Sequence, residues 1–105
     1  MNQYRIDFKT IEWESPVNGI RFKAYEQKGR KLRLVEFLKE FVESDWCTKG
    51  HIGYILEGQM EIDFNGKKEI FGPGDGVFIP SGEKYKHKGK VLTEKFKVIL
   101  VEDGA

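Results

Sequence analysis

Three side chains that can bind a metal ion or react chemically lie close together in the sequence, at Asp45, Cys47 and His51. They come just before an apolar segment, GYILEG, whose composition is typical of a β-strand. All three positions have odd numbers, and in an extended chain residues two and four apart share one face. The Lys49-Gly50 pair could break this alternation, because glycine permits a bend or a bulge. The spacing therefore predicts that the three side chains can converge on one interior.

A second segment, residues 74–89, offers further candidates and reads GDGVFIPSGEKYKHKG. Near its end Tyr85, His87 and Gly89 alternate with four lysines, which are Lys84, Lys86, Lys88 and Lys90. Four lysines rarely share a buried face, so we expect them to point to solvent and to protect a sheet edge. Tyr85 and His87 are then predicted to point inward, towards the first group.

As a metal-binding set, Asp45, Cys47, His51 and Tyr85 would supply oxygen, sulfur, nitrogen and oxygen donors. A thiolate with an imidazole and a carboxylate suits Zn²⁺ best, and a phenolate also tolerates ferric iron. We therefore expect one zinc or iron ion as the candidate cofactor. Such an ion would keep the Cys47 thiol deprotonated.

Other interpretations of the same residues remain open. A Cys47 thiol beside His51 could have a lowered pKa and act as a nucleophile. A free cysteine is also a common small buried hydrophobe, and an inward histidine is often only hydrogen-bonded. Tyr85 could fill the mouth of a barrel with its hydroxyl on one partner, and Asp45 could cap a turn.

The overall composition narrows the function classes. The 105 residues are enough for one domain with a modest core, and we expect a single domain over residues 1–105. The 18 Lys and Arg residues nearly balance the 17 Asp and Glu residues, which argues against nucleic-acid or anionic-membrane partners. The single cysteine excludes an intrachain disulfide and suits a reducing compartment. The start of the chain lacks the apolar core of a signal peptide, so we expect a cytoplasmic protein.

Strand-like segments separated by Gly, Pro and Asn turns run along the whole chain. The segment 15–19 is predicted as a turn, and 37–44 as a loop with one turn of helix. Asn65-Gly66 is a strong hairpin signal, because a type I′ turn needs two positive φ values. An all-β sandwich, jelly roll or small barrel is therefore expected. The predicted strands are 4–9, 19–27, 32–37, 51–57, 59–64, 67–71, 77–80, 84–88 and 92–101.

The spacings in residues 45–89 resemble those of the cupin superfamily. Its first motif is G-x5-H-x-H-x3-E-x6-G, with x4 in a longer variant, and here Asp45, Cys47, His51 and Gly58 have that spacing. Every ligand residue of this motif is replaced, and Lys39 stands in place of the leading glycine. The second motif is G-x5-P-x-G-x2-H-x3-N. The matching positions are Gly74, Pro80, Gly82, Tyr85 and Gly89, with Tyr85 in place of histidine and Gly89 in place of asparagine.

The resemblance implies a double-stranded β-helix barrel, often a homodimer, with a pocket at one mouth. Typical members bind iron, manganese, nickel or zinc through three histidines and one Glu or Gln. Their activities include dioxygenases, sugar isomerases or epimerases, decarboxylases and sensing domains, and the fold does not choose among them. Some thiol dioxygenases of the superfamily carry an oxidative Cys–Tyr link, which Cys47 and Tyr85 could form.

We therefore expect a cupin that binds a small polar molecule in the barrel interior and whose metal site is altered or lost. The alternative is a metal-dependent enzyme of the isomerase, epimerase or dioxygenase type, using the substituted set. Cys47, His51 and Tyr85 would then be catalytic. Further residues expected to contact the ligand are Trp46, Tyr54, His87 and Glu94, where Glu94 is on the apolar face of the last predicted strand.

Overall fold

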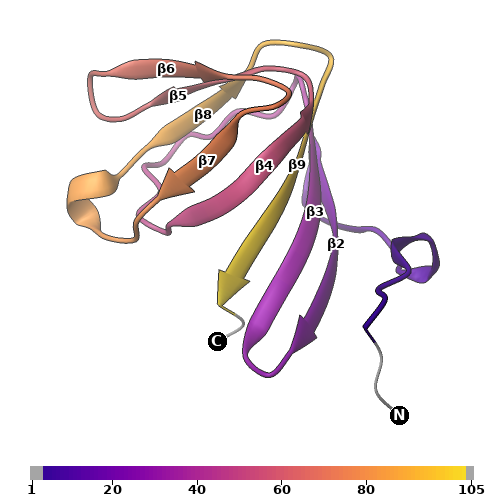
Figure 1. The fold of residues 1–105 in the computed structure, drawn as a ribbon. Coiled ribbons are helices and arrows are strands. Elements are labelled where there is room, and N and C mark those ends of the chain that lie inside the picture. The colour runs from indigo at the N-terminus through magenta and orange to yellow at the C-terminus, as the bar shows by residue number, and fades with distance from the viewer. Residues whose placement is uncertain (1–3, 104–105) are drawn as a thin grey trace.

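The computed structural model describes residues 4–103, with the side chains of that range except that of Asp103. Two antiparallel sheets form the fold (Figure 1). The larger sheet has the strand order β1 (Glu14–Val17), β2 (Ile20–Gln27), β3 (Arg30–Leu38), β9 (Lys95–Asp103), β4 (His51–Glu57) and β7 (Gly76–Ile79). The smaller sheet has the order β6 (Lys68–Phe71), β5 (Met60–Asp63) and β8 (Lys88–Val91).

The predicted all-β class is confirmed, and the antiparallel sheets fit a jelly-roll barrel. Strand β4 has the predicted bounds, and the Asn65-Gly66 hairpin joins β5 to β6 with positive φ at both residues, 62° and 112°. Gly66 N–H donates to the Asp63 carboxylate at 2.8 Å, which closes the turn. Within residues 4–103 no helix is both long and apolar enough to cross a bilayer.

The core lies between the two sheets and is built from alternate residues of facing strands. In the larger sheet Val98 of β9 pairs with Val35 of β3 on one side and with Ile55 of β4 on the other. All three are buried, at 4, 1 and 1 % exposure. Met60 and Ile62 of β5 and Val91 of β8 join the cluster from the smaller sheet. The alternation of β-strand side chains thus gives this interior its mostly apolar lining.

The N-terminal region differs from the prediction. The segment predicted as a strand at 4–9 ends instead in a short 3₁₀ helix, η1 (Phe8–Thr10). The Asp7 carboxylate accepts a hydrogen bond from Lys9 N–H, a local contact that favours a turn over a strand. The predicted turn at 15–19 contains most of strand β1, because those residues pair with the start of β2.

The segment predicted as a strand at 84–88 also differs. A second 3₁₀ helix, η2 (Glu83–Tyr85), follows Gly82, whose φ of +137° lies outside the range that other residues readily adopt. Strand β8 then begins only at Lys88. The predicted inward orientation is therefore wrong for Tyr85, which is 37 % exposed, and confirmed for His87, which is 4 % exposed.

Candidate metal centre and interior cavity

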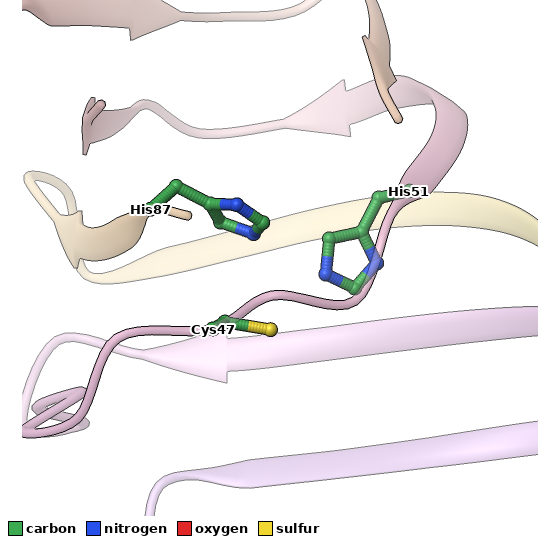
Figure 2. A group of neighbouring side chains, drawn as sticks. All are labelled: Cys47, His51 and His87. Carbon is green, nitrogen blue, oxygen red and sulfur yellow. The ribbon is translucent and has the colours of Figure 1, made fainter. Parts of the chain in front are cut away.

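Cys47, His51 and His87 come together at one end of the interior (Figure 2). One donor atom from each residue lies within 4.8 Å of the other two. The two imidazole rings meet edge to face, with centroids 5.4 Å apart and planes at 75°. Figure 2 shows the rings and the thiol turned towards one another, with Cys47 and His51 on one stretch of the chain and His87 on another.

The backbone fixes these three positions relative to one another. Cys47 and His87 form an isolated antiparallel bridge, in which each N–H donates to the other residue's carbonyl, at 2.8 and 3.0 Å. His51 is the first residue of β4 and pairs with Ile79 of β7. Gly50 permits the close approach before it, because a Cβ at that position would collide with the Ile79 carbonyl. The bridge to His87 and the pairing with Ile79 thus fix the positions of Cys47 and His51 relative to each other.

Polar contacts favour one tautomer of each imidazole. His87 Nδ1 lies 3.1 Å from the Tyr85 carbonyl oxygen, which can only accept a hydrogen bond. His51 Nδ1 lies 3.6 Å from Glu102 Oε2, slightly beyond direct hydrogen-bond length. A proton on each Nδ1 suits these neighbours and leaves the Nε2 lone pair of each ring free for a ligand.

Glu102 belongs to a buried charge network behind His51. Its carboxylate accepts a hydrogen bond from Arg33 Nη2 at 2.6 Å, and Lys49 Nζ lies 3.9 Å from its other oxygen. Burial raises the pKa of Glu102, but the contacts with His51 and Arg33 and the charge of Lys49 outweigh burial and lower the pKa to about 2. The network therefore keeps a carboxylate charged beside His51.

The Cys47–His51–His87 group lines an interior cavity of about 210 Å³. Its walls are mainly aliphatic and aromatic side chains from both sheets, among them Val35, Phe37, Ile55, Ile62, Phe96 and Val98. Arg33 and Glu43 also line it. The Glu43 carboxylate accepts a hydrogen bond from Gly89 N–H at 2.8 Å, which ties residue 43 to strand β8.

The other residues predicted for the site lie elsewhere. Asp45 is exposed and outside the group, and Tyr85 is 37 % exposed and borders a different, outer pocket. Tyr54 is 50 % exposed on the outer face of β4, since it alternates with the inward Ile55. The Trp46 ring lies at the surface, 4.6 Å from Lys88 Nζ. None of these four residues lines the interior cavity.

Glu94 was expected to point inward, and the structure places it at the surface. Strand β9 begins only at Lys95, so the alternation of that strand does not extend to Glu94. The same alternation does apply at Phe96, Val98, Leu100 and Glu102, all of which are buried. Glu102, Arg33 and Glu43 were missed by sequence reasoning. Strand parity could have found Glu102 and Arg33, whereas Glu43 lies in a loop.

The three residues could hold a metal ion, judged by donor type and by proximity. One thiolate with two imidazoles is a donor set that zinc sites use, leaving a fourth position open. Around tetrahedral zinc, such ligand atoms are roughly 3.3–3.6 Å apart. Separations of up to 4.8 Å therefore require side-chain movements of about 1 Å, within reach of small χ adjustments.

Comparisons with known proteins agree with this architecture. Comparison with curated proteins found no significant match. KdgF from Halomonas sp. is similar in structure, with a TM-score of 0.77 and 22% identity over 92% of this chain and 91% of that one. The polyketide cyclase RemF from Streptomyces resistomycificus has a TM-score of 0.78 and 19% identity over 99% and 81%. An RmlC-like cupin from Shewanella frigidimarina has a TM-score of 0.73 and 17% identity, over 99% of this chain and 93% of that one.

At these identities the likeness shows the fold, and the family rests on a separate match. The model of the cupin domain matches residues 47–102, a little over half of the chain, which include all three residues of the Cys47–His51–His87 group. The chain belongs to the cupin family.

Proposed function

We propose that this cupin binds one zinc or iron ion through Cys47 Sγ and the Nε2 atoms of His51 and His87, and that the site holds a small molecule in the interior cavity. The observation that supports the proposal most strongly is the convergence of the three donors within 4.8 Å. Soft thiolate and imidazole donors favour zinc over magnesium or calcium. The ligand set thus retains Cys47 and His51 of the predicted set and replaces Asp45 and Tyr85 with His87.

Three protein ligands would leave a coordination position open towards the cavity. A small molecule could occupy that position with one polar group while its remaining atoms contact the cavity walls. This supports a ligand-binding role for the barrel interior. The polar end of the cavity supplies the contact for a polar ligand group, and the walls add apolar contact area.

A metal-dependent enzyme is the second candidate, and the open position favours it. An ion with three protein ligands and one exchangeable site can polarise a substrate oxygen as a Lewis acid. A candidate proton acceptor near the group is Glu43, which lines the same cavity. An isomerase, epimerase or dioxygenase type of reaction would each need substrate to reach this open site.

We also propose that a second copy of this chain covers the outer face of the larger sheet. On this face Ile52 pairs with Phe78 on one side and with Val101 on the other, so the three side chains form an apolar row across β7, β4 and β9. They are 46, 74 and 41 % exposed. A homodimer would bury this row, and a mass measured by light scattering during gel filtration tests it. A free thiol in the site suits a reducing compartment such as the cytoplasm.

Metal content tests the main proposal. Untagged protein purified without chelators, and then incubated with zinc or ferrous iron, should contain about one ion per chain by plasma mass spectrometry. Cys47→Ser, His51→Gln and His87→Gln should each lower the affinity at least tenfold. Asp45→Asn and Tyr85→Phe are matched controls that should leave it unchanged. If the control variants lower the metal affinity and the three ligand variants do not, the proposed ligand set is wrong.

A further inference from the structure

We propose that the natural ligand of the interior cavity is a small carboxylate with an apolar body about the size of one ring, bound with the carboxylate at the Cys47–His51–His87 end. The proposal deepens the proposed function by naming the ligand class. It rests on that function only for the contact between the carboxylate and the ion.

The strand registers make the cavity polar at one end and apolar at the other. Phe37 of β3 pairs with Phe96 at the start of β9, whereas Arg33 pairs with Leu100 near its end. On the smaller sheet, Met60 pairs with Val91 and Ile62 with Gly89, two residues beyond His87. Phe37, Phe96 and Met60 therefore lie towards one end of the cavity, and Arg33 and His87 towards the other, so the lining changes from apolar to polar along the strands. A ligand that matches this lining has its polar group at one end only.

The apolar walls exclude a ligand with polar groups all round. Every hydroxyl of a sugar-like molecule placed beside Val35, Ile55 and Val98 would lose its hydrogen bonds to water without finding a partner. Side chains in this region are at most 4 % exposed, so little solvent reaches them. The wall chemistry therefore favours a hydrocarbon body over a polyhydroxylated one.

The cavity volume sets the size of that body. An apolar protein cavity of about 150 Å³ is sufficient to bind benzene. The cavity here measures about 210 Å³, which leaves room for one ring and a short substituent. A branched aliphatic chain of similar volume would also fit. A two-ring or long-chain body would need the walls to move.

An anionic head group suits the polar end. Arg33 lines the cavity, and its Nε is a buried donor with no hydrogen-bond partner among the described residues. Its Nη2 is already bound to Glu102, so the guanidinium is held in place. The groups at this end that attract an anion are therefore the proposed ion and Arg33 Nε. A carboxylate, with two acceptor oxygens, can satisfy both.

Binding of four matched probes tests the ligand class. Benzoate is the ring-sized apolar carboxylate, benzyl alcohol removes the charge, gluconate keeps the charge on a polyhydroxylated body, and naphthoate adds a ring. Isothermal titration on metal-free and zinc-loaded protein should give tightest binding for benzoate, at least tenfold tighter than for gluconate and fivefold tighter than for benzyl alcohol. Naphthoate should bind at least fivefold more weakly than benzoate.

Two further measurements locate the probe. Benzoate should shift the methyl NMR signals of Val35 and Val98 and leave that of the exposed Val42 unchanged. Arg33→Lys keeps the charge beside Glu102 but removes the Nε donor, so it should weaken benzoate at least fivefold and benzyl alcohol by a smaller factor. The methyl shifts need no variant, so they decide the location even if Arg33→Lys does not fold.

The results separate this inference from the metal proposal. Equal binding of gluconate and benzoate, or no binding of any probe, would overturn the ligand class whatever the metal content. Benzoate binding that is the same with and without zinc would support the cavity and carboxylate assignment while removing the metal contact. Shifts at Val42 with none at Val35 and Val98 would show that benzoate binds at the surface, which also overturns the inference.

Discussion

His51 Nδ1 lies 3.6 Å from Glu102 Oε2, so a buried carboxylate stands behind one of the three candidate metal ligands. The Glu102 side chain is only 2 % exposed, and Arg33 holds the same oxygen at 2.6 Å. A carboxylate in this position orients an imidazole, fixes its tautomer and raises its basicity towards a metal. Glu102 is thus a positioning residue for His51 in the proposed metal site.

Glu102→Gln should weaken zinc binding by about 10- to 100-fold, because His51 would lose the charge that orients its ring. Glu36 offers a matched control. Its side chain is similarly buried, at 4 % exposure, and its ion pairs are with Arg21 and Lys97 rather than with the His51 group. Competition with a chromophoric chelator measures both affinities. Equal losses of zinc affinity in Glu102→Gln and Glu36→Gln would mean that removing any buried charge weakens zinc binding, and that the contact between Glu102 and His51 is not the cause.

Acid should destabilise the metal-free protein through Glu102. The pKa of this group is lowered to about 2 from an ordinary value of 4.5, so its stabilising effect is complete above pH 4.5 and is lost as the pH falls towards 2. The lowered pKa corresponds to a contribution of about 3 kcal/mol to the free energy of unfolding. Urea unfolding between pH 6 and pH 2.5, with chelator present, measures it. The Glu102→Gln variant should show a flatter pH profile, and an unchanged slope would count against the assigned cause.

Two isoleucines of strand β4 test the orientation of its faces. Ile55→Ala should lower the free energy of unfolding by about 2–4 kcal/mol, because Ile55 is 1 % exposed between the sheets. Ile52→Ala, on the outer face at 46 % exposure, should cost less than about 1 kcal/mol in the monomer. Chemical unfolding at low protein concentration compares them directly. Similar costs for both variants would be inconsistent with the placement of this strand.

Sequence patterns predicted the strands well where turn chemistry and alternation agree. Asn65-Gly66 specified its hairpin, because both residues need positive φ and the flanking runs alternate. The 4–9 segment failed because the Asp7 side chain makes a local contact that a strand would not use. Such competition between side chain and backbone depends on local geometry that composition alone does not reveal.

The candidate site could be predicted only in part for a related reason. Odd-number spacing predicted that Asp45, Cys47 and His51 converge, and the structure brings together only Cys47 and His51, while alternation placed His87 inside. Tyr85 was expected beside His87, but the 3₁₀ turn η2 ends at Tyr85 and turns it outward. The Cys47–His87 bridge joins residues 40 positions apart, and long-range pairing of that kind is set by tertiary packing.

X-ray absorption at the zinc edge of the zinc-loaded protein identifies the atoms bound to the ion. We expect one sulfur neighbour at about 2.3 Å and two imidazole nitrogens at about 2.0–2.1 Å, with the sulfur signal lost in Cys47→Ser. A zinc ion surrounded only by oxygen and nitrogen in the unsubstituted protein would contradict the proposed ligand set, since Cys47 would then not be a ligand.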